Sequence, residues 1–178
     1  LYLLFFFNLI KTYEIVGLEF KKPNHIEIIK SKKSNFVNTF LEKMRIERTS
    51  ASNLAHVDFE NLTFGSVFTD HMFVCKYKNE KWQEPEVIPY QPLSFEPSMS
   101  VLHYGQSVFE GMKAYKDDED KVWLFRPDQN FKRINRSSER LQIPVFPENY
   151  FFEGLKTLLN LDKDWIKTGI GNSLYVRP

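Results

Sequence analysis

A basic segment in the last third of the chain carries arginines at a spacing that suits an anion site. Arg133, Arg136 and Arg140 recur at i, i+3 and i+7, so in a helix they share one face, with Lys132 beside it. A guanidinium binds phosphate through two parallel N–H donors, which makes this face a candidate phosphate site. The same pattern fits a solvent-exposed face opposite an apolar stripe that begins at Phe131. Spacing alone favours the exposed face.

Tyr175 and Arg177 form a second candidate pair, in a short segment of alternating polar and apolar residues. Side chains alternate along a strand, so these two residues are predicted to lie on the same side of a sheet. A phenol hydroxyl beside a guanidinium would suit a carboxylate ligand. Spacing alone again favours the simpler interpretation, an ordinary half-exposed strand face.

The segment from Leu102 to Gly111 combines aromatic residues with two glycines. Glycines flank a segment in this way where the backbone turns sharply or approaches a ligand closely. Within it, Glu110 is a candidate acid or base and His103 a candidate metal ligand. A structural role is predicted for both, because neither has a Ser-His-Asp arrangement or a second histidine at metal spacing nearby.

Short strands separated by turns are expected to position these residues. The sequence predicts strands at 66–77, 82–90, 112–116, 121–125 and 173–177. Prolines restrict the segment 82–90 to an edge or irregular strand. The predicted turn at 117–120 is acidic, but it lacks the glycine and the distant glutamate of a calcium loop.

Two helices are predicted between the hairpins and the last strand. The first is capped by Asp128, and the second opens at Pro147. Their apolar faces are predicted to consist of Phe131, Ile134 and Leu141 in the first helix and Phe151, Leu155 and Leu158 in the second. Antiparallel hairpins combined with helices indicate an α+β domain.

The beginning of the sequence is unlike the rest. Leu1 to Ile10 is almost wholly apolar, but it is about half as long as the ~20 residues that span a bilayer, and no small-residue cleavage site follows it. It is predicted to be a non-native or mistranslated leader or a simple edge strand, with a targeting remnant as the alternative, and it is given no role in function. A helix is predicted at 35–48. Because the sequence starts with Leu1 rather than Met and stops at Pro178 within a predicted strand, we expect a fragment of a longer protein.

Composition and charge exclude several classes of protein. Of the 178 residues, 42% are hydrophobic and 16% aromatic, which excludes a disordered segment, and the length predicts one domain. A formal net charge of +1 gives no overall field that would attract nucleic acid or an anionic membrane. The single cysteine, Cys75, excludes an internal disulfide and a thiolate zinc site, and it predicts a reducing compartment, the cytoplasm.

Four motifs that occur in one order carry a family resemblance. They are FGSVFTDHM at 64–72, LHYGQ at 102–106 with FEGMKAY at 109–115, FKRI at 131–134, and SLYVRP at 173–178. This ordered set resembles the N-terminal domain of branched-chain amino acid aminotransferases, which are pyridoxal-phosphate enzymes of fold type IV. The resemblance implies a small domain over residues 59–178, an antiparallel sheet with flanking helices, preceded by an extension over residues 1–58.

The resemblance implies roles for individual residues. Arg133 matches the arginine that grips the phosphate of pyridoxal 5'-phosphate, whereas the other two arginines of its helix gain no role. Tyr175 and Arg177 match residues on the substrate-carboxylate side. The aromatic wall around the aliphatic side chain of the substrate is matched by Phe64, Tyr104 and Phe109.

The implied activity is transamination between leucine, isoleucine or valine and 2-oxoglutarate, with glutamate and branched-chain 2-oxo acids as the other pair. In the family, the lysine that forms the Schiff base with the cofactor belongs to the C-terminal domain, which corresponds to a position beyond Pro178. This chain alone is therefore expected to lack the catalytic lysine and to be inactive. No metal, nucleic acid or membrane is an expected partner, and the full-length protein is expected to be a homodimer.

Three alternatives remain open. D-amino-acid aminotransferase and aminodeoxychorismate lyase share fold type IV, although the segments 68–72 and 102–106 favour the branched-chain group. A stand-alone domain without catalytic function is the second alternative. The third is a basic module that binds nucleic acid, against which the balanced charge argues. Its cations would be Arg126, Lys132, Arg133, Arg136 and Arg140.

Overall fold

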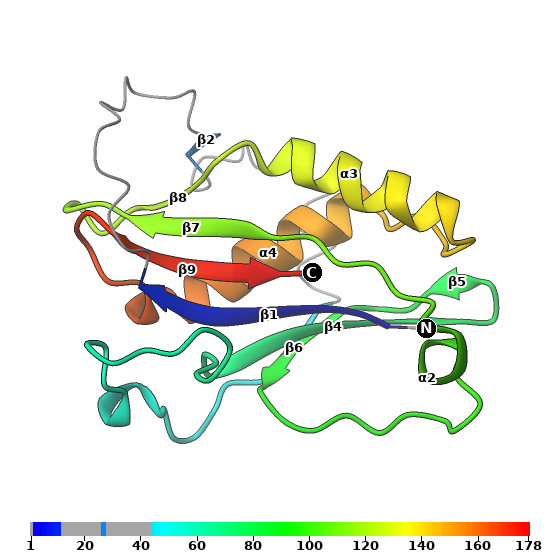
Figure 1. The fold of residues 1–178 in the computed structure, drawn as a ribbon, viewed down its shortest axis with the longest axis horizontal. Helices are drawn as coiled ribbons and strands as arrows, with labels where there is room; N and C mark the ends of the chain where they lie inside the picture. The colour runs from blue at the N-terminus through cyan, green and yellow to red at the C-terminus, as the bar shows by residue number, and fades with distance from the viewer. Residues whose placement is uncertain (1, 12–25, 28–43) are drawn as a thin grey trace.

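The computed structural model describes residues 2–11, 26–27 and 44–178, drawn in colour in Figure 1. The strands are β1 (Tyr2–Lys11), β2 (Ile26–Glu27), β3 (Arg45–Ile46), β4 (His71–Lys78), β5 (Lys81–Trp82), β6 (Glu86–Pro89), β7 (Met112–Lys116), β8 (Val122–Leu124) and β9 (Asn172–Arg177). The helices are α2 (Ser100–Tyr104), α3 (Pro127–Arg140) and α4 (Glu148–Leu161), with short 3-10 turns at Leu54–His56 and Lys163–Trp165.

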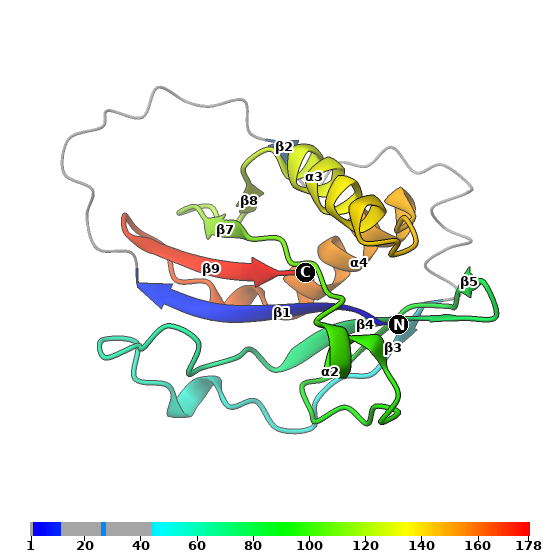
Figure 2. The same cartoon turned by 45° about the vertical axis from the view of Figure 1, so that its right-hand side comes forward.

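The described strands form one sheet in the order β2-β8-β7-β9-β1-β4-β6-β3, and β5 pairs with the end of β4. Every pairing between named strands is antiparallel except that of β3 with β6. Helices α3 and α4 lie next to each other, whereas α2 lies apart from them near the start of β1 (Figures 1 and 2). The architecture is α+β, as predicted, and among the described strands the parallel β3–β6 pair departs from the predicted antiparallel sheet.

The main core lies between the sheet and α4. Phe151, Leu155 and Leu158 of α4 are at most 1% exposed and pack with Phe73 of β4. The helix approaches the strand so closely that a Cβ on Gly154 would overlap the Phe73 ring. Burial of these large side chains is the main source of stability here, at roughly 1.5–3 kcal/mol for each. The predicted apolar face of the second helix is confirmed.

Helix α3 differs from the prediction at its start. It begins at Pro127, preceded by Arg126 in the left-handed region (φ 47°), and the structure shows no side-chain cap. Asp128 lies inside the first turn rather than capping it, where its charge still stabilises the N-terminal end of the helix dipole. Of the predicted apolar stripe, Ile134 is buried, whereas Leu141 is 42% exposed because it follows the last helical residue.

Strand β1 corrects the expectation for the first ten residues. It pairs with β4 on one side, from Tyr2↔Lys76 to Phe5↔Phe73, and with β9 on the other, from Phe6↔Arg177 to Lys11↔Asn172. The expectation of an edge strand is therefore wrong. An apolar run cannot show by itself how many neighbours it has, because strand pairing joins segments that are far apart in the sequence.

The predicted helix at 35–48 falls mainly outside the described residues, which resume at 44. Where the chain is described, Arg45 and Ile46 form strand β3. The last part of that helix prediction is therefore wrong. Among the described residues, no helix is long and apolar enough to cross a membrane.

Candidate functional site

The pairing of β7 with β9 brings two predicted site residues to the segment around Glu110. Lys113 lies opposite Tyr175 in the register, and the backbone N–H of Glu110 donates to the carbonyl of Pro178 at 3.0 Å. Leu174 and Val176 are fully buried, whereas Tyr175 and Arg177 are half-buried. This alternation confirms that Tyr175 and Arg177 share one face of the sheet, opposite the core.

Arg133 of α3 binds the carboxylate of Glu110, a pairing that the spacing of residues in the sequence does not predict. Its Nε donates to Oε2 of Glu110 at 2.6 Å, and its Nη2 donates to Oε1. The Glu110 side chain is 2% exposed, whereas that of Arg133 is 59% exposed. A buried carboxylate is stable only when it is paired and hydrogen-bonded, so this contact fixes the segment around Glu110 onto α3.

Two neighbours complete the environment of Glu110. The backbone N–H of Gly111 donates to Oε1 at 2.7 Å, and Asn130, one turn before Arg133, donates to the Gly111 carbonyl at 3.2 Å. Burial by itself would raise the pKa of Glu110. The hydrogen bonds from Arg133, Gly111 and Asn130 and the charge of Arg133 outweigh it, so the pKa lies below its ordinary value. The hydrogen bonds to Arg133 and Gly111 give Glu110 a structural role, which agrees with the prediction for this residue.

Gly111 brings Tyr175 next to this ion pair. A Cβ on Gly111 would lie 2.5 Å from the phenol oxygen of Tyr175, so only glycine leaves room for that side chain. On its other side the Tyr175 ring meets Phe64, at 5.6 Å between ring centroids and an interplanar angle of 60°. Tyr175 therefore joins Phe64 to the segment that holds Arg133.

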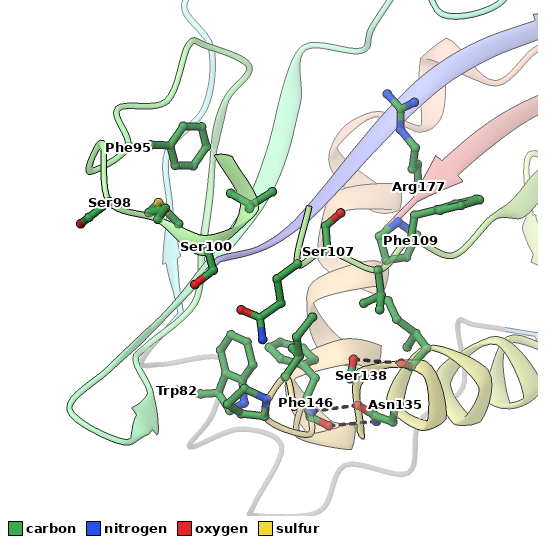
Figure 3. Close-up of a pocket in the computed structure, with 18 residues that line it drawn as sticks. Trp82, Phe95, Ser98, Ser100, Ser107, Phe109, Asn135, Ser138, Phe146 and Arg177 are labelled. Carbon is green, nitrogen blue, oxygen red and sulfur yellow. Dashed lines mark hydrogen bonds between the residues drawn. The ribbon is translucent and has the colours of Figure 1, made fainter. Parts of the chain in front are cut away.

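A cavity of about 460 Å³ lies next to the same segment. Phe109 and Arg177 are among its lining residues, and Figure 3 shows them close together, with Arg177 directed away from α3. The opposite wall comes from α3 and the loop that follows it, where Asn135 exchanges two hydrogen bonds with the backbone of Phe146, at 2.8 and 3.2 Å. The lining combines apolar side chains with polar ones, among them Ser107, Asn135 and Ser138.

Only some of the predicted site residues line the cavity. Arg133, Tyr175 and Phe64 are not lining residues and lie around Glu110 and Gly111 instead. The two arginines are linked through Glu110, whose side chain binds Arg133 and whose backbone binds Pro178, next to Arg177. Residues 108–111 are therefore the segment on which most of the predicted site residues converge.

Tyr104 stands apart from this group. It is the last residue of α2, before Gly105 in the left-handed region (φ 61°), and it is 86% exposed. Phe64 and Phe109 are also exposed, at 62% and 75%. Among the described residues, no ring contact joins these three aromatic residues to one another, and no group of His, Cys, Asp or Glu is arranged to hold a metal ion.

The sequence did not indicate a contact of Asn130 with Gly111, nor that Glu110 is the partner of Arg133. A weak signal for both existed, because Asn130 and Arg133 lie at i and i+3 and must share a face of α3. Arg136 and Arg140 are exposed, which agrees with their interpretation as surface charges.

Comparison with known proteins assigns the chain to a family. It is 51% identical over 138 residues, 77% of its length, to branched-chain-amino-acid aminotransferase 2 of Bacillus subtilis. It is 52% identical over 122 residues, 68% of its length, to branched-chain-amino-acid transaminase 1 of the same organism. The branched-chain-amino-acid aminotransferase of Dictyostelium discoideum is 44% identical over 149 residues, 83% of this chain.

These matches cover 38%, 34% and 39% of the three relatives, so the chain spans little more than a third of their length. No protein-family model matches it. Identity of this level over most of the chain nevertheless agrees with the four ordered motifs, which include the Glu110 segment and the Arg133 helix. Over the part that matches, the chain therefore belongs to the branched-chain-amino-acid aminotransferase family.

Proposed function

We propose that this chain supplies part of the active site of a branched-chain amino acid transaminase that uses pyridoxal 5'-phosphate. The observation that carries the proposal is the identity of about half the matched residues to aminotransferases of that name. The proposal includes a fold type IV small domain at 59–178, a homodimeric full-length protein and a Schiff-base lysine outside this chain.

The residues present fit the phosphate of that cofactor. Arg133 is anchored on its inner edge by Glu110, yet its side chain is 59% exposed, so its outer edge can meet an anion from solvent. A guanidinium with a fixed plane can bind a phosphate through two parallel hydrogen bonds. Arg133 would hold the phosphate, and Gly111 keeps Tyr175 close to the same position.

The bound cofactor would supply an aldehyde group able to carry an amino group and an electron-withdrawing ring able to stabilise negative charge next to it. Tyr175 and Arg177, on the same face of β9, would donate hydrogen bonds to a substrate carboxylate. Phe64, Tyr104 and Phe109 would offer apolar surface to the side chain. Leucine, isoleucine and valine differ only in shape and surface, and one methylene changes binding by about 1–3 kcal/mol, so modest discrimination among them is expected.

The decisive experiment joins this sequence to the C-terminal part of a relative and measures amino transfer from leucine to 2-oxoglutarate. We expect activity with branched-chain amino acids and not with D-amino acids. Retention of pyridoxal phosphate on gel filtration should fall more in Arg133→Ala than in the matched control Arg136→Ala, because only Arg133 belongs to the Glu110 network. Equal retention in the two variants would remove the phosphate assignment.

A second experiment addresses the lysine. Borohydride reduction of the 178-residue chain with pyridoxal phosphate should give weak labelling spread over several lysines. Specific trapping on one lysine of this chain would contradict the proposal that the reactive amine lies elsewhere.

A further inference from the structure

Glu110 combines two properties that are costly together, burial and negative charge. Its side chain is 2% exposed, and its oxygens accept hydrogen bonds from Arg133 and from the Gly111 backbone. An apolar residue of similar size would avoid the desolvation penalty of a buried ion. Stability alone therefore does not explain a carboxylate at this position. What the carboxylate adds is a fixed orientation of the Arg133 guanidinium.

The geometry of the contact fixes the whole guanidinium. Arg133 uses Nε and Nη2 toward Glu110, which leaves Nη1 and the second Nη2 hydrogen on the outer edge, where no described residue binds Nη1. Because the guanidinium is a rigid planar fork, holding one edge sets the direction of the other. An exposed arginine without such a partner would sample many rotamers and lose that freedom upon binding a ligand.

The support of Glu110 comes from the same helix face. Asn130, one turn before Arg133, donates to the Gly111 carbonyl at 3.2 Å, so α3 holds the Glu110–Gly111 segment at two points. The backbone N–H of Glu110 is itself bound to Pro178 at 3.0 Å. Glu110 therefore cannot follow Arg133 if the arginine moves, and it acts as the fixed member of the pair.

We infer that Glu110 is a positioning residue: it presents the outer edge of Arg133 to a phosphate group without touching that group itself. The inference rests on the proposed function, since it takes Arg133 as the phosphate ligand. The ion pair is neutral as a whole, so its contribution is direction rather than added positive charge. Removing the Glu110 charge should accordingly weaken phosphate binding, even though it makes the local potential more positive.

The test uses the whole 178-residue chain, labelled with 15N and titrated with pyridoxamine 5'-phosphate. This probe carries the phosphate but no aldehyde, so it does not react with lysines. Pyridoxamine, which lacks the phosphate, is the matched ligand control. The readouts are the dissociation constant and the Nε–Hε signal of Arg133, with the signal of Arg136 as the internal reference for a mobile arginine.

Glu110→Gln keeps the shape of the side chain and removes its charge. We expect it to weaken binding of the phosphate probe by about three- to tenfold, the scale of ordering one side chain, and to leave binding of pyridoxamine unchanged. Its matched control is Glu86→Gln, which breaks another arginine–glutamate pair, with Arg45, on a strand separated from β7 by three others. The control should bind the probe as the original chain does.

A coupled variant separates positioning from a general structural role. Lysine lacks the fork that Glu110 holds, so in an Arg133→Lys background the Glu110→Gln change should alter binding by less than about twofold. Two results would overturn the inference. One is the same loss of affinity in both backgrounds. The other is a Glu110→Gln chain that binds the probe at least as tightly as the original chain.

The outcomes also separate this inference from the proposed function. If Arg133→Ala binds the phosphate probe as well as the original chain, or if the probe leaves the Arg133 signal of that chain unchanged up to its solubility limit, the phosphate assignment itself fails. If Arg133→Ala weakens binding and Glu110→Gln does not, only the positioning role fails. Should Glu110→Gln not fold, the original chain decides: an Arg133 Nε–Hε signal as mobile as that of Arg136 would overturn the inference.

Discussion

Nδ1 of His71 lies 2.6 Å from a carboxylate oxygen of Asp162, which joins the first residue of β4 to the end of α4. The second carboxylate oxygen accepts the backbone N–H of His71 at 3.1 Å. On the far side of the ring, Nε2 accepts the backbone N–H of Thr49 at 3.0 Å, so the hydrogen-bond pattern places the proton on Nδ1. Three segments of the chain therefore meet at one buried imidazole.

Asp162→Ala should lower the free energy of unfolding by about 2–4 kcal/mol, because it leaves two buried N–H groups of His71 without an acceptor. Urea denaturation followed by tryptophan fluorescence measures the change. Asp164→Ala, two residues along at an exposed position, is the control and should change stability by less than about 0.5 kcal/mol. A loss as small in Asp162→Ala would show that the His71 contacts contribute little.

Glu110 should make the stability of the chain depend on pH in the acid range. Its pKa is lowered from the ordinary 4.5, so the unfolded chain takes up this proton at a higher pH than the native state does. The stabilisation is complete above the pKa of Glu110 in the unfolded chain, and it is lost as the pH falls through the pKa of Glu110 in the native state. The stability difference between the original chain and Glu110→Gln should therefore be constant near neutral pH and shrink below 4.5.

The matched control for this pH series is Glu96→Gln, which changes an exposed carboxyl. Its stability difference from the original chain should stay flat across the same range. A flat difference for Glu110→Gln as well would contradict the lowered pKa.

Gly111→Ala should destabilise the chain by about 1–3 kcal/mol, because the new methyl group would lie 2.5 Å from the phenol oxygen of Tyr175. Thermal or urea denaturation gives the magnitude. Combining it with Tyr175→Val, which removes the ring, should recover most of the loss relative to Tyr175→Val alone. Additive losses in the double variant would mean that the two residues do not crowd each other.

Cys75 should be inert in the folded chain. Burial, followed by the charges of Glu84 and Glu86, raises the pKa of its thiol to about 12, so almost none of it is thiolate at pH 8. We expect iodoacetamide labelling in buffer to be at least about a hundredfold slower than in denaturant. Because Cys75 is the only cysteine in the chain, a single mass increment reports the reaction. Comparable rates in the two conditions would contradict the buried position.

Local patterns predicted those parts of the fold that depend on near neighbours in the sequence. The hairpin of β7 and β8, strand β9 and the buried face of α4 follow from alternation, turn residues and helical spacing, and all are observed. The common face of Tyr175 and Arg177 follows from the same rule. These features depend only on the periodicity of hydrophobic residues and on the secondary-structure propensity of each residue type, and both can be read from a single sequence.

The remaining features depend on which distant segments meet. The spacing of residues along α3 does not show that Arg133 binds Glu110, 23 residues earlier in the chain. Nor does the sequence of β9 show that the Tyr175 ring packs against Gly111. The ordered motifs identified these residues without giving their contacts. For β1, the composition of the run predicted neither its position in the sheet nor its two partners.

The central place of β1 has a mechanical consequence for the whole sheet. β1 bonds β4 along residues 2–5 and β9 along residues 6–11, so its two halves join two strands that are not paired with each other. Without β1, β4 would lose its partner along residues 73–76 and β9 its partner along residues 172–177, and both strands would present open N–H and C=O groups. Open strand edges of this kind are templates for pairing with another chain, so β1 protects the sheet against edge-to-edge aggregation.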